Sequence, residues 1–291
     1  MIAFSGVRSS WLMFARNYRI VDERPQRERS LRVVRRLIGL LLGIVSLALP
    51  TRAIAAEGPV PTGVAAWEAL WTSVLSKVVD GAGRIDFVRL KDDHADLDRV
   101  VAFIAAVDPD SQPARFPDRS SRLAYYINAY NALAMHGVLA AGVPESLGGL
   151  RKLTFFVFRT FAIGGVSRSL YGLENDVIRP LGEERVHFAL NCMVVGCPRL
   201  PREAFTANKL EQQLDDAARE FINEDRNVRV DRDRRKVWLS AIFDFYTKDF
   251  LLRAPSLIAY VNRYRTKLVP TNFKVRFLDY DWSVNDGGRM P

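Results

Sequence analysis

The stretch "VHFALNCMVVGCPRLP", residues 186–201, contains one of the three histidines and both cysteines of the chain. A cysteine acts as a nucleophile when a base such as histidine lies within hydrogen-bond reach of its thiol. Cys192 follows an apolar run and opens a turn, and reactive residues are disproportionately found on such loops. The residue types therefore make Cys192 and His187 the candidate catalytic residues, with His136 as a second candidate base.

Other interpretations of the two cysteines stay open. A structural zinc needs four ligands, and only the histidines could complete a set with Cys192 and Cys197, so we expect no metal and no cofactor. A Cys192–Cys197 disulfide would suit an exported protein and a short turn that contains a glycine. Cys192 could also be a buried small hydrophobe, and His187 a hydrogen-bonded core histidine.

The segment "RVHFALN", residues 185–191, has the apolar character of a buried strand. Side chains alternate along a strand, so positions 187 and 192 would face opposite sides. A bulge between them would be needed to bring the thiol and the imidazole together.

Further polar residues are candidates for binding a ligand. Asn128 and Asn131 share one face of a predicted helix, and buried amides need polar partners. Together with Glu174 and Asn191 they complete the predicted site. Asp249 falls near the end of a predicted helix, where an acid opposes the helix dipole, so we expect it to pair with an arginine.

The charge is concentrated at the N-terminus. The net charge is +9, but residues 1–55 hold ten arginines and three acids, which leaves +2 for the remainder. The body is therefore near neutral, and we expect no nucleic-acid partner. The apolar run at 37–50 is short for a membrane span, which needs about 20 residues. It follows arginines and precedes an A-x-A site, which predicts a signal peptide cleaved after Ala55 or Ala56.

Hydrophobic periodicity predicts the remaining organisation. Residues 56–64 are a linker, 65–285 one domain and 286–291 a tail. The pattern predicts a helix-rich α+β domain with a small, mostly antiparallel sheet. We expect helices over the ranges 67–78, 93–107, 121–142, 169–181, 202–224, 241–252 and 255–265. Strands or extended segments are expected over 84–90, 154–165, 185–191 and 273–282, with a hairpin over 227–240.

Several long motifs resemble the bacterial, exported branch of the family named domain of unknown function 547. They are "YYINAYNALAMHGVL" (125–139), "RVHFALNCMVVGCPRL" (185–200), "EAFTANKLEQQLDDAAREFIN" (203–223), "LSAIFDFYTKDF" (239–250) and "YDWSVN" (280–285). The resemblance spans about 65–285 and implies a module without an assigned reaction. The chain departs from the family pattern at Glu174-Asn175, where the pattern usually reads Glu-His.

Two functions are compatible with these residues. The first is an exported thiol-dependent hydrolase or transferase that uses Cys192 with His187. The second is a non-catalytic periplasmic binding or interaction module with a structural Cys192–Cys197 disulfide. Either would act in the periplasm or cell envelope on a small-molecule or peptide ligand, with membrane contact only through an uncleaved leader.

Overall fold

The computed structural model describes residues 58–288, which belong to one compact unit, Ala56–Pro291. The predicted signal segment, its cleavage site and the last residues of the predicted tail lie outside the described residues. The α-helices are α3 (Val64–Val78), α4 (Phe87–Asp92), α5 (Ala95–Ala106), α6 (Arg119–Ala140), α7 (Leu170–Gly172), α8 (Leu210–Asn223), α9 (Ala241–Phe245), α10 (Thr247–Leu251) and α11 (Leu257–Asn262). The strands are β1 (Thr160–Ile163), β2 (Val166–Ser169), β3 (Val228–Asp231), β4 (Lys236–Leu239) and β5 (Lys274–Phe277).

Two π-helical turns and several 3₁₀ turns complete the described elements. The π-helical turns are Leu153–Phe158 and Leu173–Ile178, and the 3₁₀ turns are Pro113–Arg115, Arg179–Leu181 and Glu184–Phe188. Helices thus predominate over two small sheets, which confirms the predicted single-domain α+β class.

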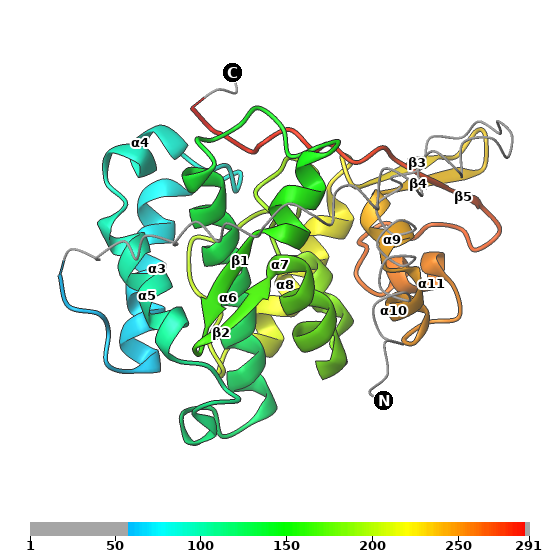
Figure 1. The fold of residues 1–291 in the computed structure, drawn as a ribbon. Helices are drawn as coiled ribbons and strands as arrows, with labels where there is room; N and C mark the ends of the chain where they lie inside the picture. The colour runs from blue at the N-terminus through cyan, green and yellow to red at the C-terminus, as the bar shows by residue number, and fades with distance from the viewer. Residues whose placement is uncertain (1–57, 289–291) are drawn as a thin grey trace, which may run out of the picture. The chain divides into compact units, whose positions relative to one another are not determined.

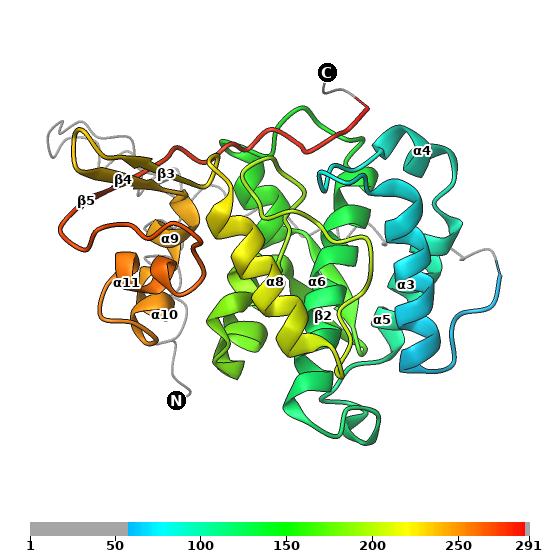
Figure 2. The same ribbon diagram turned by 180° about the vertical axis from the view of Figure 1, so that it is seen from behind.

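The long helix α6 organises the first of two apolar cores. It begins where Asp118 and Ser121 form a capping box, since the Asp118 side chain accepts from the Ser121 N–H and the Ser121 side chain bonds the Asp118 N–H. Most of its circumference is buried. Figures 1 and 2 show α6 between α3 and α5 on one side and α8 on the other. The predicted central helix over 121–142 is confirmed.

The two sheets are short. Strands β1 and β2 form an antiparallel hairpin, and β3 and β4 form the hairpin predicted over 227–240. Strand β5 adds to β4 in parallel, with Trp238 opposite Arg276. The predicted closing strand over 273–282 is therefore shorter than expected. The inner face of this sheet packs on a second core that includes Phe221, Phe243, Phe250 and Tyr260.

The strand predicted over 185–191 is wrong, because the chain there forms the 3₁₀ turn Glu184–Phe188. Residues two positions apart would share one face of a strand, but here they are buried in different cores. Val186 packs in the core around α6, while Phe188 packs in the second core. A short, continuously apolar run of sequence is compatible with a buried strand and with a buried helical turn, because periodicity does not distinguish them.

Three other expectations also need correction. The segment 154–165 begins as a π-helical turn and becomes strand only from Thr160. The segment 84–90 contributes isolated bridges at Ile85, after which the Asp86 side chain caps α4. Helix α8 starts at Leu210 rather than near 202. The residues before it stay irregular because their main chain is bound by a side chain of α6, as described below.

Candidate functional site

Residues 191–197, here called the thiol turn, carry both cysteines. Cys192 is partly exposed and Cys197 is buried. Met193 has a φ of 65°, in the left-handed region that residues other than glycine rarely occupy. Asn191 stabilises this conformation, because its Oδ1 accepts from the Met193 N–H at 2.7 Å and its Nδ2 donates to the Pro198 carbonyl at 2.6 Å. One buried amide therefore holds both sides of the turn.

The two asparagines of α6 bind main chain. Asn131 accepts from the Asn191 N–H at 2.8 Å and donates to the Ala189 carbonyl at 3.0 Å. Asn128 makes the same pair of bonds with Phe205, at 2.7 and 2.9 Å. The predicted need of these amides for polar partners is thus met by the backbone. Asn128, Asn131 and Asn191 fix the segments around Cys192, and each of the three amides bonds main chain through both its oxygen and its nitrogen.

The two sulfurs share one hydroxyl group. The Tyr280 hydroxyl lies 3.5 Å from Cys192 Sγ and 3.2 Å from Cys197 Sγ. Cys197 Sγ also accepts from the Cys192 main-chain N–H at 3.0 Å. Both cysteines are free thiols in the structure.

The chain around Tyr280 closes over the thiol turn. The Gly196 N–H donates to the Asp281 carbonyl and the Val195 N–H to the Ser283 carbonyl, each at 2.9 Å. A Cβ at position 196 would lie 2.9 Å from Tyr280 Cε2, closer than side chains approach. Only glycine therefore allows the Tyr280 ring to cover the turn and reach both sulfurs.

The two thiols differ in acidity. Although the Cys192 residue is partly exposed, its sulfur is buried, and this burial, followed by hydrogen bonding to Cys197, raises the pKa of the Cys192 thiol well above its usual value. Burial also disfavours a Cys197 thiolate, but hydrogen bonds from Cys192 and Tyr280 outweigh it and lower the pKa of Cys197. Burial raises the pKa of Tyr280, which therefore remains a hydroxyl. Within the pair, Cys192 holds its proton and Cys197 is the better anion.

His187 belongs to a separate group of residues, here called the His187 cluster. Its Nε2 lies 2.9 Å from Asp249 Oδ2, and its ring stacks on Tyr246 with ring centroids 3.7 Å apart. Arg179 binds both oxygens of Asp249, at 2.8 and 2.9 Å, so the predicted arginine partner of Asp249 is confirmed. Burial opposes ionisation of Asp249, but hydrogen bonds from His187 and Arg179 lower the pKa of its carboxyl far below the usual range.

Glu174 lies between the two groups. It is buried, it accepts a short hydrogen bond from the Tyr246 hydroxyl, and its Oε2 lies 3.5 Å from the Tyr130 hydroxyl. Its negative charge is among the influences that raise the pKa of Cys192. Glu174 therefore connects the thiol turn electrostatically to Tyr246 and, through the stacked rings, to His187.

The predicted pairing of Cys192 with His187 is not formed. Among residues 58–288, His187 contacts Asp249, Tyr246 and Phe250, and no hydrogen bond joins it to Cys192. The alternative base His136 pairs with Asp98 instead, with its Nε2 3.4 Å from Asp98 Oδ1. In the described part of the chain, no group of three or more His, Cys, Asp or Glu is arranged to hold a metal ion.

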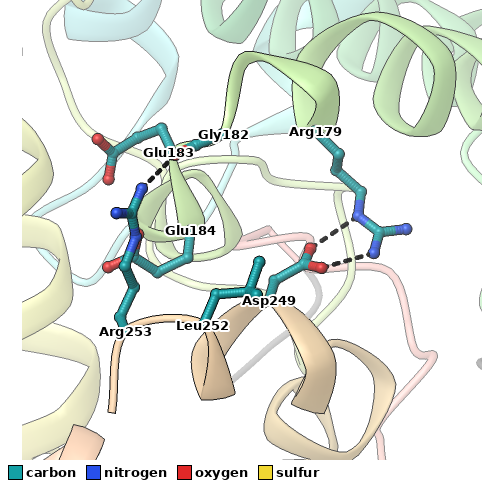
Figure 3. Close-up of a pocket in the computed structure, with 7 residues that line it drawn as sticks. All are labelled: Arg179, Gly182, Glu183, Glu184, Asp249, Leu252 and Arg253. Carbon is teal, nitrogen blue, oxygen red and sulfur yellow. Dashed lines mark hydrogen bonds and ion pairs between the residues drawn. The ribbon is translucent and has the colours of Figure 1, made fainter.

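A small pocket opens beside Asp249. Figure 3 shows Arg179 turned toward Asp249 on one side and Arg253 near Gly182 and Glu184 on the other. The charged side chains that line the pocket pair with one another. Arg253 binds Glu184 at 2.9 Å and the Gly182 carbonyl at 2.6 Å, and Arg179 binds Asp249. The cavity measures about 210 Å³, below the roughly 300 Å³ at which small-molecule sites usually begin. We therefore assign no ligand to it.

Residues 114–222 match the sequence model of the family described as "Protein of unknown function, DUF547". The matched segment is similar in sequence to that family. It includes Glu174, His187 and both cysteines of the sites described above. No curated protein and no solved structure matches the chain.

Three residues that contact the candidate site residues follow the matched segment. Tyr246 lies at the junction of α9 and α10, Asp249 lies in α10, and Tyr280 follows β5. Sequence reasoning did not assign them to the site. The one available signal was that Tyr280 begins the motif "YDWSVN" and Asp249 lies in "LSAIFDFYTKDF".

Proposed function

We propose that the protein is an exported thiol-dependent hydrolase or transferase in which Cys192 is the nucleophile. The observation that carries the proposal is the thiol turn, where a partly exposed cysteine precedes a residue with positive φ and its sulfur shares the Tyr280 hydroxyl with Cys197. Strained backbone of this kind is concentrated at functional sites. The N-terminal sequence pattern supports export to the periplasm or cell envelope.

The acidities of the two thiols suggest how the nucleophile is activated. Cys192 reacts as a thiol that loses its proton during attack, and Cys197 Sγ accepts that proton. A bond forms between Cys192 Sγ and an acyl carbon of a small-molecule or peptide substrate, and the leaving group departs with the proton from Cys197. Water or another acceptor then cleaves the thioester. His187 acts at a distance in this scheme, as a positioning residue for Tyr246 and Glu174.

The test is acylation of the purified protein with p-nitrophenyl acetate, followed by intact mass measurement and peptide mapping. We expect an acetyl group on Cys192 that is absent in Cys192→Ala. We expect Cys197→Ser to acylate about 100-fold more slowly, the scale of general base catalysis. An acylation rate at Cys192 no higher than in the denatured chain would overturn the proposal.

A second candidate is a binding module stapled by a Cys192–Cys197 disulfide. It is favoured by the position of both sulfurs on one hydroxyl, at 3.5 and 3.2 Å. Peptide mapping without reduction separates the two candidates. A linked Cys192–Cys197 peptide in protein isolated from cells, with no acylation after reduction, supports the module and excludes the enzyme.

A further inference from the structure

Away from the thiol turn, the sheet β3-β4-β5 presents a strongly basic outer face. Register places Arg229, Trp238 and Arg276 in one row across the three strands, and Asp231, Lys236 and Lys274 in the next. The alternate side chains of these strands, such as Val237 and Leu239, are buried in the second core. The basic side chains therefore point outward from the core.

The charge continues into the turn between β3 and β4 and the loop beside it. Together the hairpin 229–236 and the residues Lys267, Lys274 and Arg276 hold eight cations and two acids, Asp231 and Asp233. This net charge of six stands out because residues 56–291 as a whole carry +2, so the rest of that segment carries −4. One end of the domain is thus basic while the remainder is acidic. We call these residues, with Leu268, the basic end.

An exposed apolar side chain lies within the basic end. Leu268 is 61% exposed, and the Arg232 side chain donates to the Leu268 carbonyl at 3.4 Å. Figures 1 and 2 show the β3–β4 hairpin and β5 at the end of the domain away from α3, and the turn residues 232–235 are exposed. Cations around an exposed leucine fit a surface that is anionic outside and apolar beneath, as a membrane is.

We propose that the basic end docks the domain on an anionic phospholipid surface. Arg232, Arg234 and Arg235 contact lipid phosphates, and Leu268 enters the headgroup region. A nucleic acid fits less well, because binding of single strands relies on exposed aromatic rings on which bases stack. Here the Trp238 ring is partly buried and lies 5.8 Å from the Arg229 guanidinium. Leu268 would have no role on a phosphate backbone. No helix among residues 58–288 is long and apolar enough to span a bilayer.

The test is sedimentation of the full chain with phosphatidylcholine vesicles, with and without phosphatidylglycerol. We expect binding that requires phosphatidylglycerol and weakens with salt. The variant R232E/R234E/R235E should bind these vesicles at least 100-fold more weakly, since each basic residue near an anionic surface raises the affinity about fivefold. The control K91E/R151E/K209E changes the net charge equally at exposed residues elsewhere and should bind like the natural chain.

A second variant separates the contribution of Leu268 insertion from that of the basic side chains. Leu268→Ser keeps every cation and should weaken binding at high salt more than at low salt. The proposal is overturned if the hairpin variant still binds, which would assign binding to other residues such as the leader, or if both triple variants lose binding equally. It is also overturned if the natural chain binds a single-stranded oligonucleotide and vesicles with phosphatidylglycerol do not compete.

Discussion

Cys192 of the thiol turn and His187 of the His187 cluster lie five residues apart in the sequence, but their two groups are held together by different interactions. The thiol turn is held by neutral hydrogen bonds from Asn131 and Asn191, and its two sulfurs share protons with Tyr280. The His187 cluster is held by the ion pair of Asp249 with Arg179 and by the hydrogen bond of Asp249 with His187. The comparison teaches that a cysteine and a histidine close in sequence need not act together, because each takes the partner that later segments of the chain supply.

The largest expected effect is loss of stability when the ion-paired cluster is broken. Asp249→Asn removes the carboxylate that neutralises Arg179 and forms a hydrogen bond with the nearly inaccessible His187. We expect the free energy of unfolding to fall by about 3 kcal/mol, as when one partner of a buried ion pair is deleted. Urea denaturation measures the change. Asp96→Asn is the control, because its pairs with Lys77 and Arg99 are more exposed and should be worth less than about 1 kcal/mol. Equal losses in the two variants would contradict the comparison.

The link between the two groups is tested by Tyr246→Phe. The variant keeps the ring that stacks on His187 but deletes the hydroxyl that donates to the buried Glu174. We expect a loss of about 1–3 kcal/mol in unfolding free energy, the usual cost of leaving a buried acceptor poorly satisfied. Tyr130→Phe, whose contact with Glu174 is longer at 3.5 Å, should cost less when both are measured by urea denaturation. A larger loss of stability in Tyr130→Phe than in Tyr246→Phe would show that Tyr246 is not the main donor to Glu174.

The pH dependence of stability should come from the His187 cluster. The pKa of Asp249 is lowered in the folded protein, so its carboxylate contributes stability above the unfolded pKa of about 3.9. That contribution is lost as the pH falls below about 4 toward the folded pKa. The difference in unfolding free energy between the natural chain and Asp249→Asn should therefore shrink between pH 6 and pH 3, roughly in step with carboxyl protonation. Urea denaturation at a series of pH values measures this difference. A difference that stays constant would place the acid sensitivity elsewhere.

The sequence correctly predicted those helices and strands that bury one face and expose the other. Helices α3 and α5 have a regular apolar face, with Trp67, Trp71 and Leu97 buried where periodicity expects them. The alternating strands of the 227–240 hairpin were equally clear. The 3₁₀ turn Glu184–Phe188 was mistaken for a strand because Val186 and Phe188 are buried in different cores, which periodicity along the chain does not register.

The site was predicted in part. Cys192, His187, Glu174 and the asparagines were found because their residue types are unusual within apolar motifs. Their partners were not, because Tyr246, Asp249 and Tyr280 reach them only through tertiary contacts over 62 to 88 residues of sequence. The asparagines also show that a buried polar side chain signals a requirement for partners, which the main chain can meet as fully as a ligand can.

The most direct test of the central claim is the pH profile of Cys192 alkylation by iodoacetamide in the natural chain and two variants. If Cys192 is governed by its thiol partner, the midpoint should lie above the ordinary value of about 8.5 and move down in Cys197→Ser, which removes the neighbouring anion. His187→Gln, which keeps a donor for Asp249, should leave the midpoint unchanged. A midpoint that moves with His187→Gln and not with Cys197→Ser would contradict the thiol pair and restore the cysteine–histidine assignment.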